Sequence, residues 1–418
     1  MGEWQAVNDD NQDVEPSVIA ITRNGVDYIT TCYIKFVGSD PRNYFSTTTD
    51  LVNFTRGQLP MPSGYQRSAD PLLSENPYTN GIAPGRIYLT GIVFNTDTTS
   101  GYGPSGVVVW RSDDGGVSWY QPQFVESTSN PDLFLDKPAI TVSWYSGTRG
   151  YVYVAYIRIN RGTPDELVVA RSTNGGETFG TPIVVATGDG IQGPQVLADY
   201  YHGNVYVLWA DRTLEAIQMS TSNDYGQTWT PPEEVATGDI MGGGKKEWLK
   251  GGVRAGTLPM ARFNWIANRI CVVWHEREQP GTNLTDVYYT AKGPSGWQAK
   301  VMVNDNQVRD QFMPALDFDV SGRIKVVFYD RRDDASNFRY HLYTAYITSN
   351  GTLVRANGRL STFSSDPRLY TSHTGFAGFI GDYQDIWDHQ YSFGEHYISS
   401  WVGIPSVGDI YLTAMSPN

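Results

Sequence analysis

The sequence predicts an all-β fold built from repeated units, and three observations predict it. Three stretches, residues 112–119, 172–179 and 222–229, share the frame Ser-x-Asp/Asn-x-Gly-x-Thr/Ser-aromatic at intervals of 60 and 50 residues. Prolines near the start of apolar runs recur at intervals of 55 to 67 residues, at Pro16, Pro71, Pro138, Pro194, Pro259 and Pro314. Aromatic residues at 13%, with 43 Gly and 23 Pro, suit many short strands joined by tight turns. Self-similarity at such a period indicates a repeat architecture.

Each repeated stretch is predicted to be a turn between two strands. It follows an apolar run, such as Val107 to Trp110, and leads into another extended segment. The acidic or amide side chain can accept hydrogen bonds from the N–H groups of the turn, and the glycine can adopt a positive φ. The aromatic residue can pack beneath the following strand, so every position of the frame has a physical reason.

The proline marks the first strand of each unit, because a missing N–H at the first residue of a strand breaks no ladder hydrogen bond. A turn and a second run ending in an aromatic residue follow, at residues 28–33, 87–94, 151–156, 205–209, 270–274 and 324–329. A seventh unit lacks the proline and has its runs at 379–383, 396–401 and 409–414. Seven units of four short strands predict a seven-bladed β-propeller, with six blades as the alternative, and a single domain over residues 1–418.

The N-terminus is predicted to complete the last blade. The seventh unit has only three strands, whereas residues 4–9 resemble residues 297–305, the outer strand of the fifth unit. The first residues should therefore add the fourth strand and close the ring, which removes an exposed sheet edge. Helices should be almost absent. The glycine-rich segment 238–256 is expected to be a long loop, either functional or a plain surface insertion.

Composition excludes several classes of partner. The net charge of −13 disfavours nucleic acid and anionic membranes as partners. The sequence contains no run of 18 apolar residues, the length needed to span a membrane. Cys32 and Cys271 fall in different repeats and are expected to be buried free thiols. The six histidines show no metal-ligand spacing, so we expect neither a metal nor a cofactor.

The repeated frame resembles the Asp-box of the sialidase superfamily of β-propellers, and the blade rhythm extends this resemblance over roughly the whole chain. The resemblance implies a glycoside hydrolase that acts on acidic or terminal sugars. It also implies a secreted protein whose leader is absent from this chain, and a carbohydrate as the partner. We expect a monomer. Sialidase chemistry uses an arginine cluster that holds the substrate carboxylate, a Tyr nucleophile activated by a Glu, and an Asp as acid/base.

Topology supplies candidates for these roles. The loops before each proline and after each second strand should share one face of the propeller, where ligands usually bind. Arg67, Arg254 and Arg309 are predicted to form the carboxylate clamp, with Arg331 and Lys137 as further substrate-binding residues. Tyr383 is the predicted nucleophile or, alternatively, a plug of the central channel. Glu247 or Glu276 would be its partner, and Asp70 or Asp136 would be the acid.

The sequence also departs from the sialidase pattern. It has no Arg-Ile-Pro motif, and typical sialidases have six blades. The pairs Asp211–Arg212 and Asp330–Arg331 can equally close their own loops as ion pairs. Two other functions therefore stay open: a propeller that binds glycans or proteins without catalysis, and a polysaccharide lyase that uses Tyr383 with His373, His389 or His396.

Overall fold

The computed structural model describes residues 2–7, 12–76, 85–96, 101–242, 247–277, 284–369, 378–391, 394–404 and 409–415. In these residues the secondary structure is almost entirely β, with a 3-10 turn, η2, at Pro367–Leu369. The strands form seven antiparallel sheets, which are the blades of the predicted propeller, and one separate hairpin. The fold is therefore a seven-bladed β-propeller.

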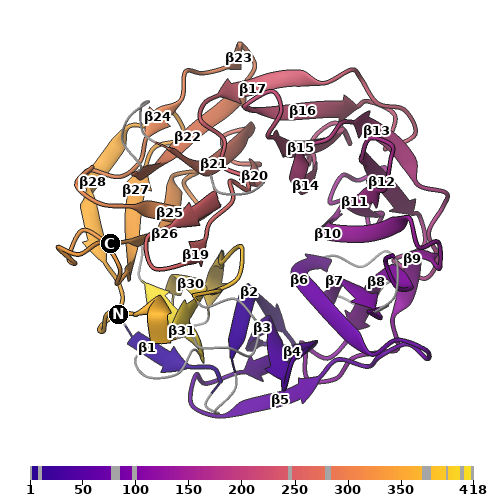
Figure 1. Ribbon diagram of the computed structural model, residues 1–418, viewed down its shortest axis with the longest axis horizontal. Coiled ribbons are helices and arrows are strands. Elements are labelled where there is room, and N and C mark those ends of the chain that lie inside the picture. Colours follow the sequence, from indigo (N-terminus) through magenta and orange to yellow (C-terminus); the bar gives the residue numbers. More distant parts are fainter. Residues whose placement is uncertain are drawn as a thin grey trace. The chain divides into compact units, whose positions relative to one another are not determined.

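Figure 1 labels the strands of each sheet. The first three sheets consist of β2 (Asp13–Arg23), β3 (Val26–Val37), β4 (Asp40–Thr48) and β5 (Phe54–Gln58); β6 (Arg67–Asn76), β7 (Arg86–Phe94), β8 (Ser105–Ser112) and β9 (Gln123–Thr128); and β10 (Leu133–Val142), β11 (Val152–Asn160), β12 (Glu166–Ser172) and β13 (Ile183–Thr187). The fourth consists of β14 (Ile191–Ala198), β15 (Val205–Asp211), β16 (Ala216–Ser222) and β17 (Glu233–Thr237).

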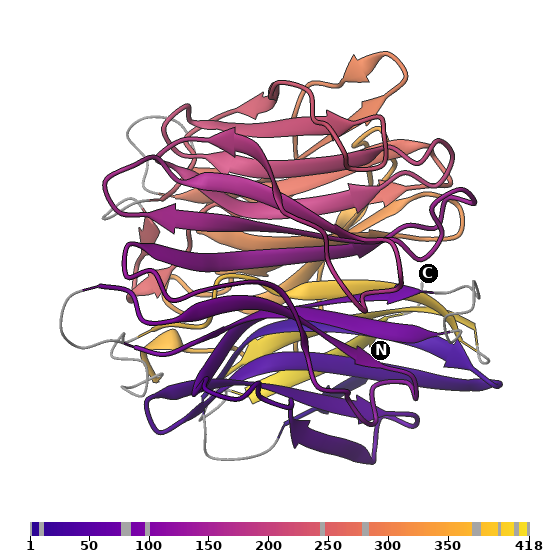
Figure 2. The ribbon, with the colours of Figure 1, turned by 90° about the vertical axis from the view of Figure 1, so that its right-hand side faces the viewer.

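The fifth sheet ends in two short outer strands, and the hairpin precedes it. The hairpin is β18 (Trp248–Leu249) with β19 (Val253–Arg254), and the sheet is β20 (Met260–Asn264), β21 (Arg269–Arg277), β22 (Thr285–Gly293), β23 (Gly296–Trp297) and β24 (Val301–Met302). The last two sheets are β25 (Gln311–Phe318), β26 (Ile324–Asp330), β27 (His341–Ile347) and β28 (Leu353–Arg359); and β29 (Asp385–Tyr391), β30 (Gly394–Gly403), β31 (Asp409–Met415) and β1 (Gly2–Gln5). Neighbouring strands run antiparallel and are joined mostly by short turns (Figure 2).

Two expectations about strand bounds need correction. The first strand of the seventh blade is β29, which begins at Asp385. Residues 379–383, which the sequence predicts to form that strand, precede it. Gly381 has a φ of 87°, and a Cβ on it would lie 2.7 Å from the backbone nitrogen of Glu15, so the chain turns tightly there. The outer strand predicted from Trp297 is also interrupted, because only residues 296–297 and 301–302 pair with β22.

The N-terminal strand completes the last sheet, as predicted. β1 pairs antiparallel with β31, with Gly2 opposite Ala414 and Gln5 opposite Tyr411. Ala6 and Val7, which follow β1, are 0% and 1% exposed. The amides of both residues donate to the carbonyl of Ile410. The strand is thus held by a backbone ladder and by apolar burial.

Deleting residues 1–7 should lower the free energy of unfolding by at least about 2 kcal/mol, because the buried Val7 side chain alone contributes that much and the edge of β31 would be left unpaired. Thermal unfolding followed by circular dichroism measures the effect. A chain that lacks only Met1 keeps β1 and serves as the control. If the two truncations melt at the same temperature, β1 does not close the blade.

The three repeated stretches form the same turn, between β8 and β9, β12 and β13, and β16 and β17. In each, the serine hydroxyl oxygen accepts the N–H of the second Gly position, over 2.8 Å at Gly116, 2.9 Å at Gly176 and 2.7 Å at Gly226. A hydroxyl of an earlier sheet then donates to a carbonyl of the turn: Thr30 to Gly115, Tyr88 to Gly175 and Tyr153 to Tyr225. The turn therefore ties consecutive blades together.

The core lies between the blades. Aromatic residues near the ends of the second strands are buried, including Trp209, Trp274 and Tyr329. Cys32 on β3 and Cys271 on β21 are buried free thiols, which confirms that prediction. The contacts between residues divide the chain into two compact units. Unit 1 consists of residues 1–18, 210–217 and 234–418, and unit 2 consists of residues 19–209 and 218–233.

Candidate functional site

A bulge at the residue before the proline shapes several first strands. In unit 2, Asp70 on β6 and Lys137 on β10 have φ values of 53° and 51°. The pairing of each strand with its neighbour breaks at the same place, between Ala69 and Leu72 and between Asp136 and Ala139. A left-handed conformation is uncommon for a non-glycine residue, and a proline next to it restricts the backbone further. Such bulges redirect side chains and often occur beside functional sites.

The bulges of β6 and β10 bring three of the predicted site residues together. The Lys137 ammonium lies 3.0 Å from Oδ1 of Asp70, and both side chains are largely shielded from solvent. Asp136 precedes Lys137, and its carboxyl group interacts with that of Asp70. Burial and the neighbouring Asp70 carboxylate raise the pKa of Asp136 to about 7, although Lys137 opposes the shift. Near neutral pH this acid pair, Asp70 with Asp136, therefore retains a proton that an ordinary aspartate would lose.

Arg67 begins β6 but has another partner. Its Nε donates to Oδ1 of Asp40 over 2.8 Å, and its Nη2 lies 2.7 Å from the same oxygen. Asp40 begins β4, so this ion pair links two consecutive blades of unit 2. The guanidinium of Arg67 is therefore already engaged by a carboxylate of the protein.

A second cluster of predicted residues forms in unit 1, around the β18–β19 hairpin. Arg254 on β19 holds Asp382 with two hydrogen bonds, from Nε to Oδ1 over 2.8 Å and from Nη2 to Oδ2 over 2.6 Å. Its guanidinium also lies 4.6 Å from the ring centroid of Phe379. Glu247, just before β18, adds a further negative charge near Arg254. We call Arg212, Glu247, Arg254 and Asp382 the arginine cluster.

Arg212 was not predicted as a site residue, yet it belongs to this cluster. Burial lowers its pKa and the like charge of Arg254 lowers it further, whereas Glu247 and Asp382 oppose the shift. Its Nε is buried and has no hydrogen-bond partner among the described residues. A Cβ on Gly242 would lie 1.8 Å from that nitrogen, so the loop passes close to the guanidinium at this glycine. Arg212 thus retains hydrogen-bonding capacity beside a second arginine.

Tyr383 follows Asp382 directly and is buried, with 7% of its surface exposed. Its neighbour Gln384 donates from Nε2 to the carbonyl of Met313 over 2.7 Å, which fixes the segment against β25. Tyr383 is therefore adjacent in sequence to Asp382, which belongs to the arginine cluster. Its role as nucleophile stays a prediction, as does that of Glu247 as its partner.

The other three predicted residues of unit 1 lie outside this cluster. Glu276 forms an ion pair with Lys300, and Nε1 of Trp274 donates to it over 2.8 Å. Arg309 donates to the carbonyls of Asp334 and Ala335. Arg331 has a fully buried side chain and lies 3.0 Å from Asp310. These contacts stabilise the loops, and the burial of Arg331 leaves a ligand no access to it.

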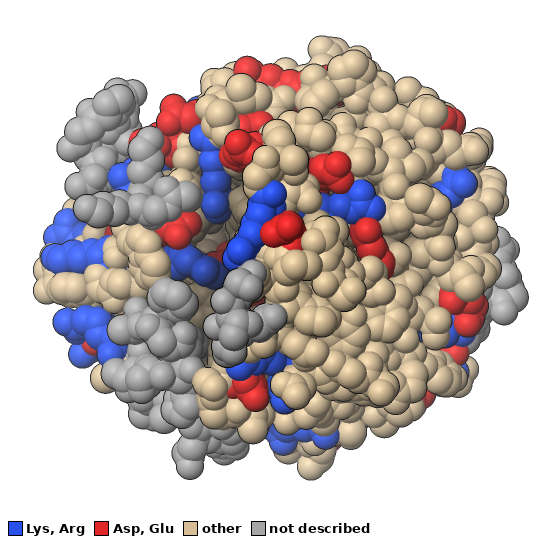
Figure 3. Space-filling view, turned by 45° about the vertical axis from the view of Figure 1, so that its right-hand side comes forward, with Lys and Arg blue, Asp and Glu red and all other residues tan. Residues whose placement is uncertain are grey.

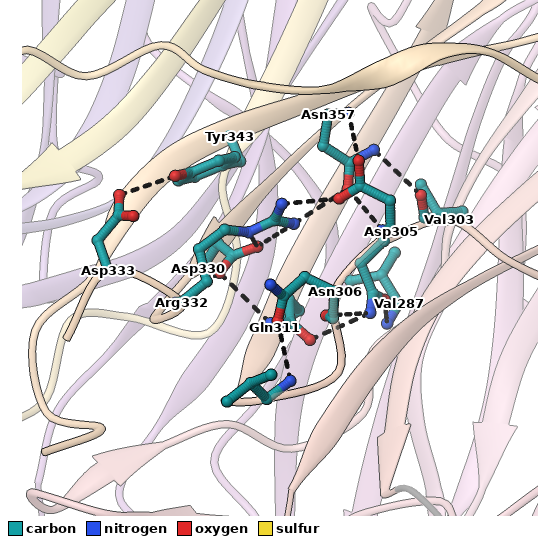
Figure 4. Close-up of polar contacts among 12 residues, drawn as sticks. Val287, Val303, Asp305, Asn306, Gln311, Asp330, Arg332, Asp333, Tyr343 and Asn357 are labelled. Carbon is teal, nitrogen blue, oxygen red and sulfur yellow. Dashed lines mark hydrogen bonds and ion pairs between the residues drawn. The ribbon is translucent and has the colours of Figure 1, made fainter. Parts of the chain in front are cut away.

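Asp330 does not pair with Arg331, its neighbour in the chain. It accepts instead from Nε of Arg332 over 2.8 Å, and Arg332 also reaches Asp305 over 2.7 Å (Figure 4). An Asp-Arg ion pair therefore does close this loop, but it joins Asp330 to Arg332 and not to Arg331. Of the lyase candidates, His373 and the side chains of His389 and His396 lie outside the described residues.

Basic and acidic side chains are interspersed on the face that Figure 3 draws. Ion pairs among the described residues fit this pattern, for example Arg158 with Glu126 at 2.9 Å. No group of three or more His, Cys, Asp or Glu side chains in the described part of the chain is arranged to hold a metal ion. Among the same residues, no helix has the length and apolar character needed to cross a membrane.

Comparison with known proteins gives a fold but no family. No protein-family model matches the chain, and no curated protein matches it. A Hadza microbial sialidase superposes with a TM-score of 0.52 at 16% identity, over 76% of this chain and 63% of the sialidase. This chain thus spans less than two thirds of that protein.

Two further solved structures show the same architecture. A leech intramolecular trans-sialidase, in complex with 2,7-anhydro-Neu5Ac, matches with a TM-score of 0.53 at 12% identity, over 84% of this chain and 68% of that one. A polysaccharide lyase, an ulvan lyase, matches with a TM-score of 0.54 at 10% identity, over 98% and 96% of the two chains. The chain therefore has a sialidase-like β-propeller fold.

Proposed function

We propose that this protein is a secreted carbohydrate-active enzyme, a glycoside hydrolase that acts on glycans with acidic or terminal sugars. The acid pair of unit 2 carries the proposal, because Asp136 has a pKa of about 7 beside a carboxylate and an ammonium group. A carboxyl group that keeps its proton at neutral pH can donate it to the oxygen of a leaving group. The three repeated turns would be Asp-boxes that hold the blades.

Asp136 would be the general acid, and its neighbours would tune it. When Asp136 gives up its proton, two carboxylates lie side by side, and Lys137 stabilises that charge at 3.0 Å from Asp70. The two carboxyl groups interact closely enough to titrate together, so they act as one acid. Glycosidases that use two separate carboxylates place them about 5–9.5 Å apart. The pair therefore supplies the acid but not the nucleophile or base.

The arginine cluster supports the acidic character of the substrate. Arg254 is held by Asp382, and Arg212 lies beside it with a partly exposed side chain. A planar guanidinium with open donors recognises carboxylates and sulfates through two parallel hydrogen bonds. The structural neighbours named above include two sialidases and a polysaccharide lyase, which is consistent with a glycan ligand.

A non-catalytic glycan-binding propeller is the second candidate. The ion pairs of the predicted arginines favour it, because Arg67 and Arg254 of the clamp are each engaged by an aspartate, as is the further predicted residue Arg331. A protein that binds glycans without catalysis needs no set of free arginines around a reacting carbon. In that case, the acid pair would serve folding only.

The test is hydrolysis of a panel of aryl glycosides of uronic acids, sialic acid and neutral sugars. We expect turnover of an acidic member, with kcat/KM falling as the pH rises above about 7, because Asp136 must be protonated in the free enzyme. Ultraviolet absorbance of an unsaturated uronate would instead identify a lyase. A protein that binds an acidic glycan but converts no substrate would overturn the proposal in favour of the binding function.

A further inference from the structure

A cavity of about 440 Å³ opens in unit 1, and none of the predicted site residues lines it. It is formed by the loop between β26 and β27, the start of β27, and η2. Its walls include Asp333, Ser336, Phe338, Arg339, His341 and Arg368. Small-molecule sites typically measure about 300–1,000 Å³, so one or two sugar rings would fit.

Two acidic side chains around this cavity, Asp334 and Asp366, already accept hydrogen bonds from the protein itself. Asp334 accepts the N–H groups of Ser336, Phe338 and Arg339. Asp366 accepts from Nε and Nη2 of Arg368, over 2.8 and 2.6 Å, and from Nε of Arg339 over 3.3 Å. Two guanidinium groups thus share a single carboxylate, and each keeps N–H groups that this carboxylate does not use.

The remaining hydrogen-bonding capacity is mostly that of donors. No hydrogen bond of the described residues uses Nη1 of Arg368 or either Nη of Arg339, whose side chain is 54% exposed. Asp333 keeps one carboxylate oxygen, since the Tyr343 hydroxyl donates to the other over 2.7 Å (Figure 4). Such a wall suits a ligand with an anionic group and a hydroxyl nearby.

The β18–β19 hairpin braces the same wall. Lys250, at the tip of the hairpin, donates from Nζ to the carbonyl of Ser336 over 2.7 Å. Its ammonium lies 4.6 Å from the ring centroid of Phe338, and the Arg368 guanidinium lies 4.4 Å from it. A Cβ on Gly251 would come within 2.9 Å of the ring, so a glycine at the tip lets the hairpin approach. Because Arg254 lies on the hairpin, one element supports both the cavity and the arginine cluster.

We propose that this cavity binds an anionic sugar unit of a glycan. Its carboxylate or sulfate would accept hydrogen bonds from Arg339 and Arg368, and a ring hydroxyl would donate to Asp333. The inference relies on the proposed function for the saccharide class of the ligand. It adds a binding site that is separate from the acid pair of unit 2.

The test measures binding of trigalacturonate by calorimetry, with the neutral trisaccharide galactotriose as comparator, on the otherwise intact Asp136→Asn chain. We expect the uronate to bind more tightly than the neutral sugar. Arg339→Gln and Arg368→Gln should each weaken uronate binding by about 10–100-fold, the effect of removing one charge-assisted contact. Ser336→Trp should abolish it by filling the cavity, since only backbone atoms of Ser336 hold the loop.

Arg355→Gln is the matched control, because it removes the same charge from the exposed strand β28 outside the cavity. Equal affinities for the uronate and the neutral sugar, or unchanged uronate binding in Arg339→Gln and Ser336→Trp, would overturn the proposal. Because binding is measured in a chain without the general acid, this outcome is separate from a failure of the hydrolase assay. A chain that hydrolyses acidic glycosides but shows no binding in the cavity would refute only the cavity proposal.

Discussion

Replacing Asp136 with Asn should lower kcat on an acidic glycoside by about 10²–10⁴-fold, the usual contribution of a positioned general acid. The amide keeps the size of the side chain but cannot donate a proton to the leaving oxygen. Steady-state rates on the substrate found in the panel measure the loss. Asp132→Asn, in the exposed turn before the same strand, is the control and should behave as wild type.

The pH profile separates a catalytic role from a structural one. Lys137 lowers the pKa of Asp136, so Lys137→Met should move the alkaline limb of kcat/KM to higher pH than in wild type. A variant that only disturbs packing would lower the rate without moving this limb. An Asp136→Asn enzyme with the wild-type rate would exclude Asp136 as the acid.

His275 should make the protein sensitive to acid, and this is the largest expected effect on stability. The imidazole on β21 is 1% exposed and lies 3.0 Å from the Ala255 carbonyl through Nε2, while its Nδ1 accepts the N–H of Met313 over 3.3 Å. Burial lowers its pKa to about 4. Protonation would place a hydrogen on Nδ1, facing another donor. The neutral ring is therefore required for this contact.

The unfolded chain takes up the proton near pH 6.5, whereas the folded chain does so only near pH 4, so acidification in this window favours unfolding. On acidification from pH 7 to pH 4.5, protonation of the imidazole should lower the free energy of unfolding by about 2–3 kcal/mol. Asp317, with a pKa raised to about 6, acts in the opposite direction. We therefore compare urea midpoints of wild type and His275→Gln at both pH values.

Glutamine can donate to Ala255 and accept from Met313 without titrating, which makes it the matched replacement. The variant should lose less stability than wild type on acidification. If both chains lose the same amount, His275 does not control the acid response. His341 is also buried and its pKa is also lowered, so His341→Gln provides a second comparison.

The sequence predicts the blades well because their signals are local. A proline at the start of a strand and the frame at 112–119 each depend on a few adjacent residues, whose backbone chemistry determines the turn. The seventh blade shows where this fails. It has no proline, and its first strand begins at Asp385 because Gly381 turns the chain against Glu15, a contact between residues far apart in sequence.

The candidate site is less predictable because it depends on which side chains of different blades meet. Asp70, Asp136 and Lys137 are all predicted as site residues, but the bulges that bring Lys137 to Asp70 are not visible in the sequence. For Arg212 the sequence leaves open whether it closes its own loop as an ion pair, and the glycines close to it in space, Gly242 and Gly256, are the available signal. The cavity beside Phe338 needs the hairpin tip and η2 together, so no local pattern indicates it.

The pairing of β1 with β31 has a consequence for the order of protein synthesis. Gly2 lies opposite Ala414, and a ribosome that adds about 5–20 residues per second needs roughly 20–80 s to make the partner strand after β1 has emerged. During that interval β1 has no sheet to join, while the earlier blades can already form around it. A nascent chain stalled before β30 should therefore expose β1 to proteases and chaperones until β30 and β31 have been made.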